Sequence, residues 1–234
     1  MILSGKQAPY FNQLESVRSR ISSACDLAGR QATDVALLAV SKRQPIEAIK
    51  GLQALGLNEF GESYASEGVE KLKIISDPEL VWHFIGPIQS NKTRLIAEHF
   101  DWVQSVDRAR IADRLNRQRP ENMAPLQVLI QVNIDSEPQK AGVMPNQLDT
   151  LAEQVAELPA MNFRGLMAIP RFGKPKNEQR RSFSELKSLF ENLKSRYKSV
   201  DMLSMGMSDD MDSAILEGST MVRVGTALFG PRQG

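Results

Sequence analysis

Cysteine and histidine are scarce in this sequence of 234 residues, which contains one cysteine, Cys25, and two histidines. A single cysteine excludes an internal disulfide framework, and we therefore expect a cytoplasmic protein in a reducing compartment. Two histidines without a companion ligand cluster argue against a metal site. No stretch approaches the roughly 20 apolar residues of a membrane span, and the residues from Met1 to Tyr10 lack the apolar run of a signal peptide.

Neither sign of charge is in excess, since 29 Lys and Arg residues stand against 28 Asp and Glu residues for a formal net charge of +1. Without a basic surface, nucleic acid is a poor candidate partner, and a small molecule is the better expectation. The near-neutral charge supplies no argument for assembly, so we predict a monomer. A membrane is not an expected partner either.

Eight short apolar or β-branched runs divide the chain, and each is short enough to be a buried strand. Segments with helical spacing lie between them, and this alternation predicts parallel strands joined by crossover helices. Eight units favour closure, so we predict an α/β fold, a single (β/α)8 TIM-type barrel forming one domain over residues 1–234, rather than an open doubly wound sheet. The runs begin near Val35, Glu59, Trp82, Trp102, Gln127, Asn162, Met202 and Met221.

Two segments lie outside this alternation. An amphipathic stretch precedes the first strand, with Gly29 placed as its C-terminal cap, and we expect an extra N-terminal helix that covers one end of the barrel. The polar segment from Arg171 to Arg181 follows the sixth strand and predicts a surface loop, with a lid as the alternative. The apolar face of the extra helix carries Leu14, Val17, Ile21, Ala24 and Leu27.

Lys42 ends a buried-strand pattern that starts at Ala36. In a barrel, groups at the C-terminal ends of strands converge on the active-site mouth. Partial desolvation there lowers the pKa of a lysine and frees its amine for imine formation. The alternative is a solvated lysine that opens a loop, and this segment alone does not decide between the two.

The segment from Ser204 to Met211 has the pattern of a strand end, a turn and a helix start. Its small residues let the chain approach an anion closely, and Ser208 can donate its hydroxyl, so a phosphate site is one interpretation. The other is an N-capped helix, in which Asp209 or Asp210 accepts from the free amides of the first turn.

The run from Met221 predicts a last strand with one arginine, Arg223, among apolar neighbours. A buried guanidinium without a partner is strongly unfavourable, so we expect Arg223 to meet a carboxylate or a ligand acceptor. Gly225 and Thr226 again combine a small residue with a hydroxyl, and the loops after the last strands of barrels often bind phosphate. His83 alternates with apolar residues and is expected to be a hydrogen-bonded core histidine.

Six ordered segments resemble the YggS/PROSC family of pyridoxal phosphate homeostasis proteins, which are related in fold to the N-terminal barrel of alanine racemase. Each fragment alone is only suggestive, but six in the same order are not expected by chance. They run through nearly the whole chain and are LLAVSK (Leu37 to Lys42), FGESY (Phe60 to Tyr64), WHFIGPIQSNK (Trp82 to Lys92), GLMAIP (Gly165 to Pro170), SMGMSDDM (Ser204 to Met211) and MVRVGTALFG (Met221 to Gly230).

The resemblance implies a fold-type III protein that binds pyridoxal 5'-phosphate. Lys42 would form the Schiff base, Arg223 would face the pyridine nitrogen, and the phosphate would be held by Ser208, Gly225 and Thr226. A permanently charged guanidinium disfavours protonation of a neighbouring ring nitrogen and weakens the cofactor as an electron sink.

Two further residues are expected at this cofactor site. Met207 precedes Ser208 in the SMGMSDDM segment. Ser63 stands where the family usually has asparagine in its FGENY segment, and a hydroxyl is shorter than an amide. The contact that the family's asparagine makes is therefore not expected to be reproduced in full.

The resemblance implies a non-catalytic protein that buffers pyridoxal phosphate or delivers it to dependent apoenzymes, and that influences amino- and keto-acid balance. The alternative is a pyridoxal-phosphate-dependent amino-acid racemase, with Lys42 as one base and Tyr64 or His83 as the other. Racemisation needs an acid or base on each face of the substrate. Because the sequence stops at Gly234, we expect no β-rich second domain to supply the opposite-face tyrosine of alanine racemases. A cofactor-free, aldolase-like barrel is the third hypothesis.

Overall fold

Eight parallel strands form a closed barrel in the computed structural model, which describes residues 8–171, 173 and 175–230. Strands that neighbour one another in the barrel are neighbours in the chain, and β8 pairs with β1 to close the ring. The strands are β1 (Ala36–Val40), β2 (Glu59–Glu62), β3 (Val81–Phe84), β4 (Trp102–Val106), β5 (Leu126–Val132), β6 (Met161–Ala168), β7 (Met202–Ser204) and β8 (Met221–Val224).

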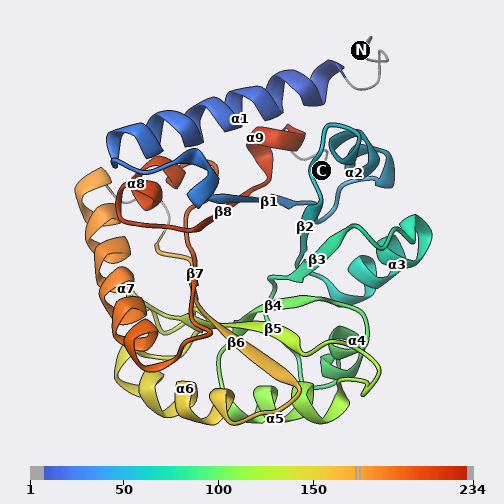
Figure 1. The fold of residues 1–234 in the computed structure, drawn as a ribbon, viewed down its shortest axis with the longest axis vertical. Helices are drawn as coiled ribbons and strands as arrows, with labels where there is room; N and C mark the ends of the chain where they lie inside the picture. The colour runs from blue at the N-terminus through green and yellow to red at the C-terminus, as the bar shows by residue number, and fades with distance from the viewer. Residues whose placement is uncertain (1–7, 172, 174, 231–234) are drawn as a thin grey trace.

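Helices surround this barrel, as Figure 1 shows. None of the helices within the described ranges is both long and apolar enough to cross a membrane. The helices are α1 (Ala8–Leu27), α2 (Ile46–Gln53), α3 (Ala65–Ile75), α4 (Thr93–Ala97), α5 (Ala109–Gln118), α6 (Leu148–Ala156), α7 (Lys176–Arg196), α8 (Met211–Leu216) and α9 (Thr226–Phe229), with short 3-10 turns η1 (Ala32–Asp34) and η2 (Pro145–Gln147).

The predicted fold class is confirmed. Each of the eight predicted strands is present and starts within one residue of its expected position. The open doubly wound alternative is wrong, because β1 pairs on one side with β2 and on the other with β8, which leaves no free edge. Parallel strands covered by helices are buried on both faces, which is why they read as short apolar runs.

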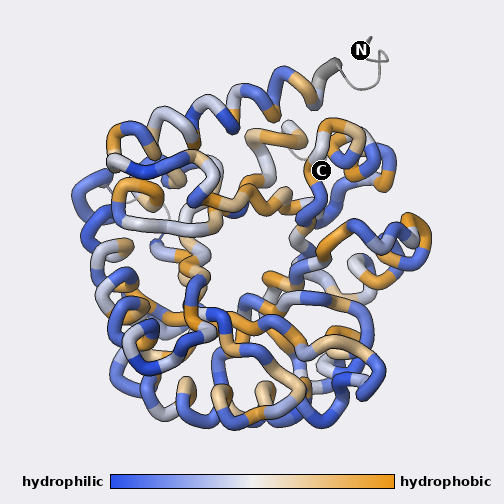
Figure 2. The backbone as a smooth tube through the Cα atoms, in the orientation of Figure 1, coloured by the Kyte–Doolittle hydropathy of each residue, from blue (hydrophilic) through white to orange (hydrophobic). Residues whose placement is uncertain are grey.

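The apolar stripes of α6 and α7 are buried. Four positions at helical spacing are buried on each helix: Leu148, Leu151, Ala152 and Val155 on α6, and Phe183, Leu186, Phe190 and Leu193 on α7. Figure 2 shows hydrophobic residues along much of the strands and hydrophilic residues along the peripheral helices. The helices are therefore held mainly by the burial of one face each.

The loop after β6 is shorter than the predicted segment from Arg171 to Arg181. Helix α7 begins at Lys176, inside that segment, because Pro175 is the extended N-cap residue and Glu178 lies in the first turn, where a carboxylate is favourable. Residues 172 and 174 of the predicted loop lie outside the described part of the chain.

The extra helix is present, but it packs against the side of the barrel and does not cover one end. Figure 1 shows α1 running along α8 and α9, which have only six and four residues. These two helices are too short to cover the outside of the barrel near β8 and β1, and α1 covers this face instead. The predicted apolar face is buried except for Leu27, which is 80% exposed. Gly29, with φ +66°, follows the helix as predicted.

Candidate functional site

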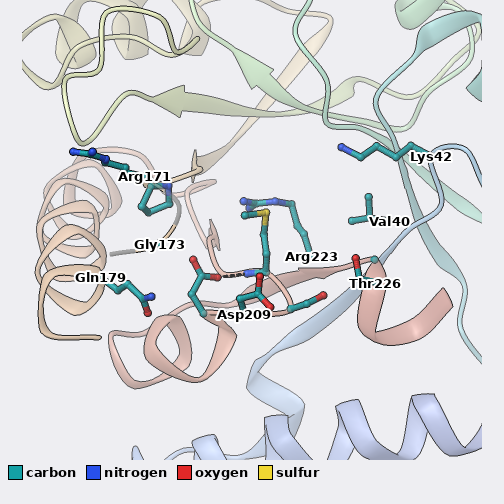
Figure 3. Close-up of a pocket in the computed structure, with 13 residues that line it drawn as sticks. Val40, Lys42, Arg171, Gly173, Gln179, Asp209, Arg223 and Thr226 are labelled. Carbon is teal, nitrogen blue, oxygen red and sulfur yellow. Dashed lines mark hydrogen bonds between the residues drawn. The ribbon is translucent and has the colours of Figure 1, made fainter. Parts of the chain in front are cut away.

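A cavity of about 300 Å³ opens where the C-terminal ends of the strands meet. It is walled by the loops after β1, β6, β7 and β8. Lys42 and Arg223 extend into it from neighbouring strands, with Arg171 and Gln179 across from them (Figure 3). The lining residues are Val40, Lys42, Pro170, Arg171, Gly173, Gln179, Met207, Ser208, Asp209, Asp210, Arg223, Gly225 and Thr226.

Lys42 lies in a turn two residues beyond the end of β1, and its side chain is partly buried. The residues on either side of it are fixed. Ser41 is fully buried, and its N–H donates to Gly61 O at 2.9 Å. Arg43 has φ +59°, a left-handed conformation that is costly for a residue with a side chain, and its N–H donates to Glu67 Oε1 at 2.6 Å. The turn that presents Lys42 is therefore held by contacts from β2 and α3.

The ammonium of Lys71 on α3 is the centre of these contacts. It donates to Ser41 O at 2.7 Å, to Glu62 Oε1 at 2.8 Å and to Glu67 Oε1 at 2.6 Å. Ser41 Oγ donates to the same oxygen of Glu62 at 2.7 Å. The Glu62 side chain is fully buried. Burial raises the pKa of the Glu62 carboxyl, and the charge of Lys71 opposes that rise.

The turns after β7 and β8 meet at one corner of the cavity. The N–H of Ala227 points to Ser208 Oγ at 3.4 Å and joins the two turns. Within the described ranges, the backbone N–H groups of Ser208 and Thr226 donate to no protein acceptor. Hydroxyl and N–H donors gathered at a cavity wall suit an anion such as a phosphate.

Gly206 and Asp210 set the shape of the turn after β7. Gly206 has φ +93°, and a Cβ at this position would lie 2.6 Å from the Cβ of Ala214, so only glycine fits. Asp210 stands at the N-cap position of α8, but it makes no side-chain capping bond, so the predicted capping contact is wrong. Its Oδ1 instead accepts from Met207 N–H, at 2.6 Å. Burial raises the pKa of Asp210, while the Met207 N–H and the charge of Arg223 oppose the rise.

Arg223 is 3% exposed and is held by two uncharged groups. Its Nη1 donates to Ser204 Oγ at 2.7 Å, and its Nη2 donates to Ala168 O at 2.8 Å. The sequence predicts that Arg223 meets either a carboxylate or a ligand acceptor. No carboxylate among the described residues is in direct contact with its guanidinium. Burial lowers the pKa of Arg223 to about 10, against the charge of Asp210, so the guanidinium remains protonated at neutral pH. His83 is fully buried and bonded to Gln104, as predicted for a core histidine.

Ser63 lies apart from the other candidate residues. It lines a second cavity, of about 470 Å³, which the loops after β2 and β3 form together with Lys92 and Ile169. The two cavities share Lys42. Six of the seven candidates thus line one cavity, and Ser63 lies on the other side of the lysine.

The loop after β6 is tied down at the rim of the first cavity. Asp135 Oδ2 accepts from Arg171 N–H at 2.6 Å, and Asp135 Oδ1 accepts from Ser182 Oγ at 2.7 Å. These bonds join the loops after β5 and β6 to the first turns of α7. Arg171 thereby joins Lys42 and Arg223 as a third cationic residue at the wall of the cavity.

Comparison with known proteins identifies the family. The family model described as alanine racemase, N-terminal domain, matches residues 13–233. The pyridoxal phosphate homeostasis protein of Haemophilus influenzae is 52% identical over 225 residues, which cover 94% of this chain and 95% of the relative. That of Escherichia coli strain K12 is 51% identical over 227 residues, covering 94% and 96%. This chain belongs to the pyridoxal phosphate homeostasis protein family.

Solved structures agree with this membership of the pyridoxal phosphate homeostasis proteins. PipY of Synechococcus elongatus PCC7942, solved with PLP bound, is 36% identical, with a TM-score of 0.80 over 92% of this chain and 100% of PipY. Alanine racemase of Corynebacterium glutamicum is 16% identical, with a TM-score of 0.67 over 94% of this chain and 62% of the racemase. The second likeness shows the barrel fold alone.

Three groups of residues at or behind this cavity were not predicted from the sequence: the cluster around Lys71, the loop residues Arg171 and Gln179, and Gln104. The cluster around Lys71 could have been expected from Glu62, because a carboxylate in a buried strand requires a partner just as the guanidinium of Arg223 does. The spacing of Glu67 and Lys71, four residues apart on a helix, also predicts an ion pair between them. No sequence pattern identifies Arg171 and Gln179, because only the folded loop brings them to the cavity.

Proposed function

We propose that this protein binds pyridoxal 5'-phosphate, with Lys42 holding the cofactor through a Schiff base and the turns after β7 and β8 holding its phosphate. One observation carries the proposal: an amine, a cluster of hydroxyl and N–H donors, and a buried guanidinium line the same cavity. The identity of about 50% to relatives named pyridoxal phosphate homeostasis proteins supports it, as does PipY, solved with PLP bound.

The residues present fit such a cofactor. A cavity of about 300 Å³ is at the small end of the usual range for ligand pockets. Donors at Ser208 and Thr226 are available to an anion, and Met207 provides an apolar wall beside them.

Each residue has a role that its chemistry allows. Bound pyridoxal phosphate supplies an aldehyde that condenses with amines and a pyridine ring that withdraws electrons. Lys42 contributes the amine, and its flanking bonds to β2 and α3 orient it. A charged Arg223 facing the ring nitrogen would disfavour a proton on that nitrogen and so would limit electron withdrawal. Ser208 and Thr226 would donate to the phosphate, and Arg171 would add positive charge at the rim.

We propose that the protein acts as a carrier or buffer of the cofactor and not as a racemase. Racemisation requires a second acid or base positioned on the opposite face of the substrate. His83 Nδ1 is bonded to Gln104 Nε2 in the core, and Tyr64 Oη accepts from Arg43 Nη2 at 3.1 Å. Neither residue lines the cavity that holds Ser208 and Arg223. A cytoplasmic location, a monomeric state and transfer to dependent apoenzymes are parts of the same proposal.

The absorbance spectrum of the purified protein mixed with pyridoxal phosphate tests the binding site. We expect a Schiff-base band near the visible edge that is lost in Lys42→Ala and kept in Lys50→Ala, a matched change at an exposed lysine on α2. A Lys42→Ala protein that retains the same band refutes the assignment. Transfer is tested by mixing loaded protein with a dependent apoenzyme and following the recovery of that enzyme's activity. Recovery no faster than with an equal amount of free cofactor rejects the carrier role.

A further inference from the structure

A row of polar side chains crosses the barrel interior behind Arg223. The guanidinium donates through Nη1 to Ser204 Oγ at 2.7 Å, and Ser204 Oγ donates to Gln104 Oε1 at 2.7 Å. At its other end, Gln104 Nε2 lies 2.9 Å from His83 Nδ1. Four residues from β8, β7, β4 and β3 thus form one connected series.

This series is embedded in the core. Ser204, Gln104 and His83 are fully buried, and Arg223 is 3% exposed. The contact between Ser204 on β7 and Gln104 on β4 joins strands that are not neighbours, so it spans the inside of the ring. Polar groups in such a core are costly unless every member is bonded. Each link of the series is a hydrogen bond, although His83 Nε2 at its far end has no hydrogen-bond partner among the described residues. A polar series of this kind that ends at the cofactor cavity calls for an explanation beyond packing.

The guanidinium end of the series sets the direction of its first hydrogen bond. A guanidinium can only donate, so Ser204 Oγ accepts from Arg223, and in the structure Ser204 donates its one proton to Gln104 Oε1. The amide nitrogen of Gln104 then faces His83 and donates to Nδ1. Neutral His83 therefore carries its proton on Nε2, which lies 3.2 Å from Glu59 Oε2, a contact close enough for electrostatic attraction but not aligned as a hydrogen bond. The ring is also stacked on Trp102, with centroids 5.2 Å apart.

We propose that Gln104 and His83 are positioning residues for Arg223. They hold the Ser204 hydroxyl in one orientation, with its proton on Gln104 Oε1 and a lone pair toward Nη1. Together with Ala168 O on Nη2, this fixes the plane of the guanidinium at the wall of the cavity. The inference rests on the proposed function, because it assigns to these residues the alignment of Arg223 with the cofactor's ring nitrogen.

Two cofactor probes separate positioning from a structural effect: pyridoxal phosphate and its 1-deaza analogue, in which carbon replaces the ring nitrogen. In Gln104→Met, which keeps the shape and removes the hydrogen bonds, we expect the affinity for pyridoxal phosphate to fall by about five- to tenfold, the worth of one hydrogen bond. The affinity for the deaza analogue should change by less than about twofold, since it offers Arg223 no nitrogen. The Schiff-base band of the natural cofactor should shift as well.

Further variants guard against a fold defect. Ser204→Ala should reproduce the loss seen in Gln104→Met, and Ser204→Thr, which keeps the hydroxyl, should restore binding. Gln131→Met is the matched control, because Gln131 is a largely buried glutamine on β5 whose side-chain amide donates to Ala141 O. The nitrogen resonances of His83 in cofactor-free protein should show the Nε2-protonated neutral ring.

The outcomes are distinguishable. Failure of the unaltered protein to bind pyridoxal phosphate rejects the proposed function itself. Normal binding with equal losses for both probes, or no loss in either Gln104→Met or Ser204→Ala, overturns the positioning role while leaving the function intact. A His83 ring protonated on Nδ1 overturns the assigned direction of the series.

Discussion

The ammonium of Lys71 lies 2.7 Å from the carbonyl oxygen of Ser41, the residue that precedes Lys42. It also lies 2.8 Å from the buried carboxylate of Glu62. One side chain on α3 therefore both neutralises a buried charge and holds the turn that presents the candidate cofactor lysine.

Replacing Lys71 with methionine should destabilise the protein and slow cofactor binding. The change leaves Glu62 buried without its cation, and breaking a buried pair in this way costs about 3–5 kcal/mol of unfolding free energy. Urea unfolding measures this loss, and stopped-flow absorbance measures the rate of Schiff-base formation. As a control, Arg94→Met removes one member of the Arg94–Glu98 pair, whose arginine side chain is 69% exposed, and should shift stability by no more than about 0.5 kcal/mol. Equal effects of the two changes would contradict the role given to Lys71.

Gly206→Ala should cost more than Gly29→Ala, although both glycines have positive φ. At Gly29 a Cβ meets no atom within 4 Å, so only the conformational cost of about 1–2 kcal/mol applies. At Gly206 the Cβ would lie 2.6 Å from that of Ala214, so the turn must move. We expect a larger loss of unfolding free energy and a loss of pyridoxal phosphate affinity for Gly206→Ala alone. The idea fails if the two variants are equally stable and bind equally well.

Ser208→Ala should weaken binding of pyridoxal phosphate but not of pyridoxal, which has no phosphate. A hydrogen bond to a charged group is worth about 1.5–3 kcal/mol, or roughly ten- to hundredfold in affinity. Titration with each compound, followed by absorbance, gives the two ratios. Ser188→Ala, on the exposed face of α7, is the matched control and should change neither. Similar losses for both compounds would place Ser208 away from the phosphate.

The partly buried carboxyl of Asp210 should make a contribution to stability that falls as the pH rises from the acid range. Burial raises its pKa in the folded protein above the ordinary value of 3.8, so the native state binds the proton more tightly than the unfolded chain. This favourable contribution is present at low pH and is lost as the carboxyl ionises above that value. Asp210→Asn, which can still accept from Met207 N–H, should therefore gain stability relative to the unaltered protein as the pH rises from about 4 to 7. Urea unfolding at several pH values measures the difference in unfolding free energy between Asp210→Asn and the unaltered protein. A difference that stays constant or changes in the opposite direction would refute the raised pKa of Asp210.

The barrel and most of its candidate site could be predicted because they depend on local patterns. Strands such as β1 are short, continuous apolar runs. Lys42 and Arg223 could be identified because each is a charged residue at the end of such a run or within one. What could not be predicted depends on contacts between distant segments. The side of the barrel on which α1 packs follows from the shortness of α8 and α9, and the contact between Gln104 and Ser204 joins residues 100 positions apart.

Cofactor binding at Lys42 is tested most directly by peptide mapping of protein loaded with pyridoxal phosphate and then reduced with borohydride. We expect one modified peptide at stoichiometric loading, with the label on Lys42. A label on another lysine, or no label under conditions in which the absorbance band has formed, would contradict it.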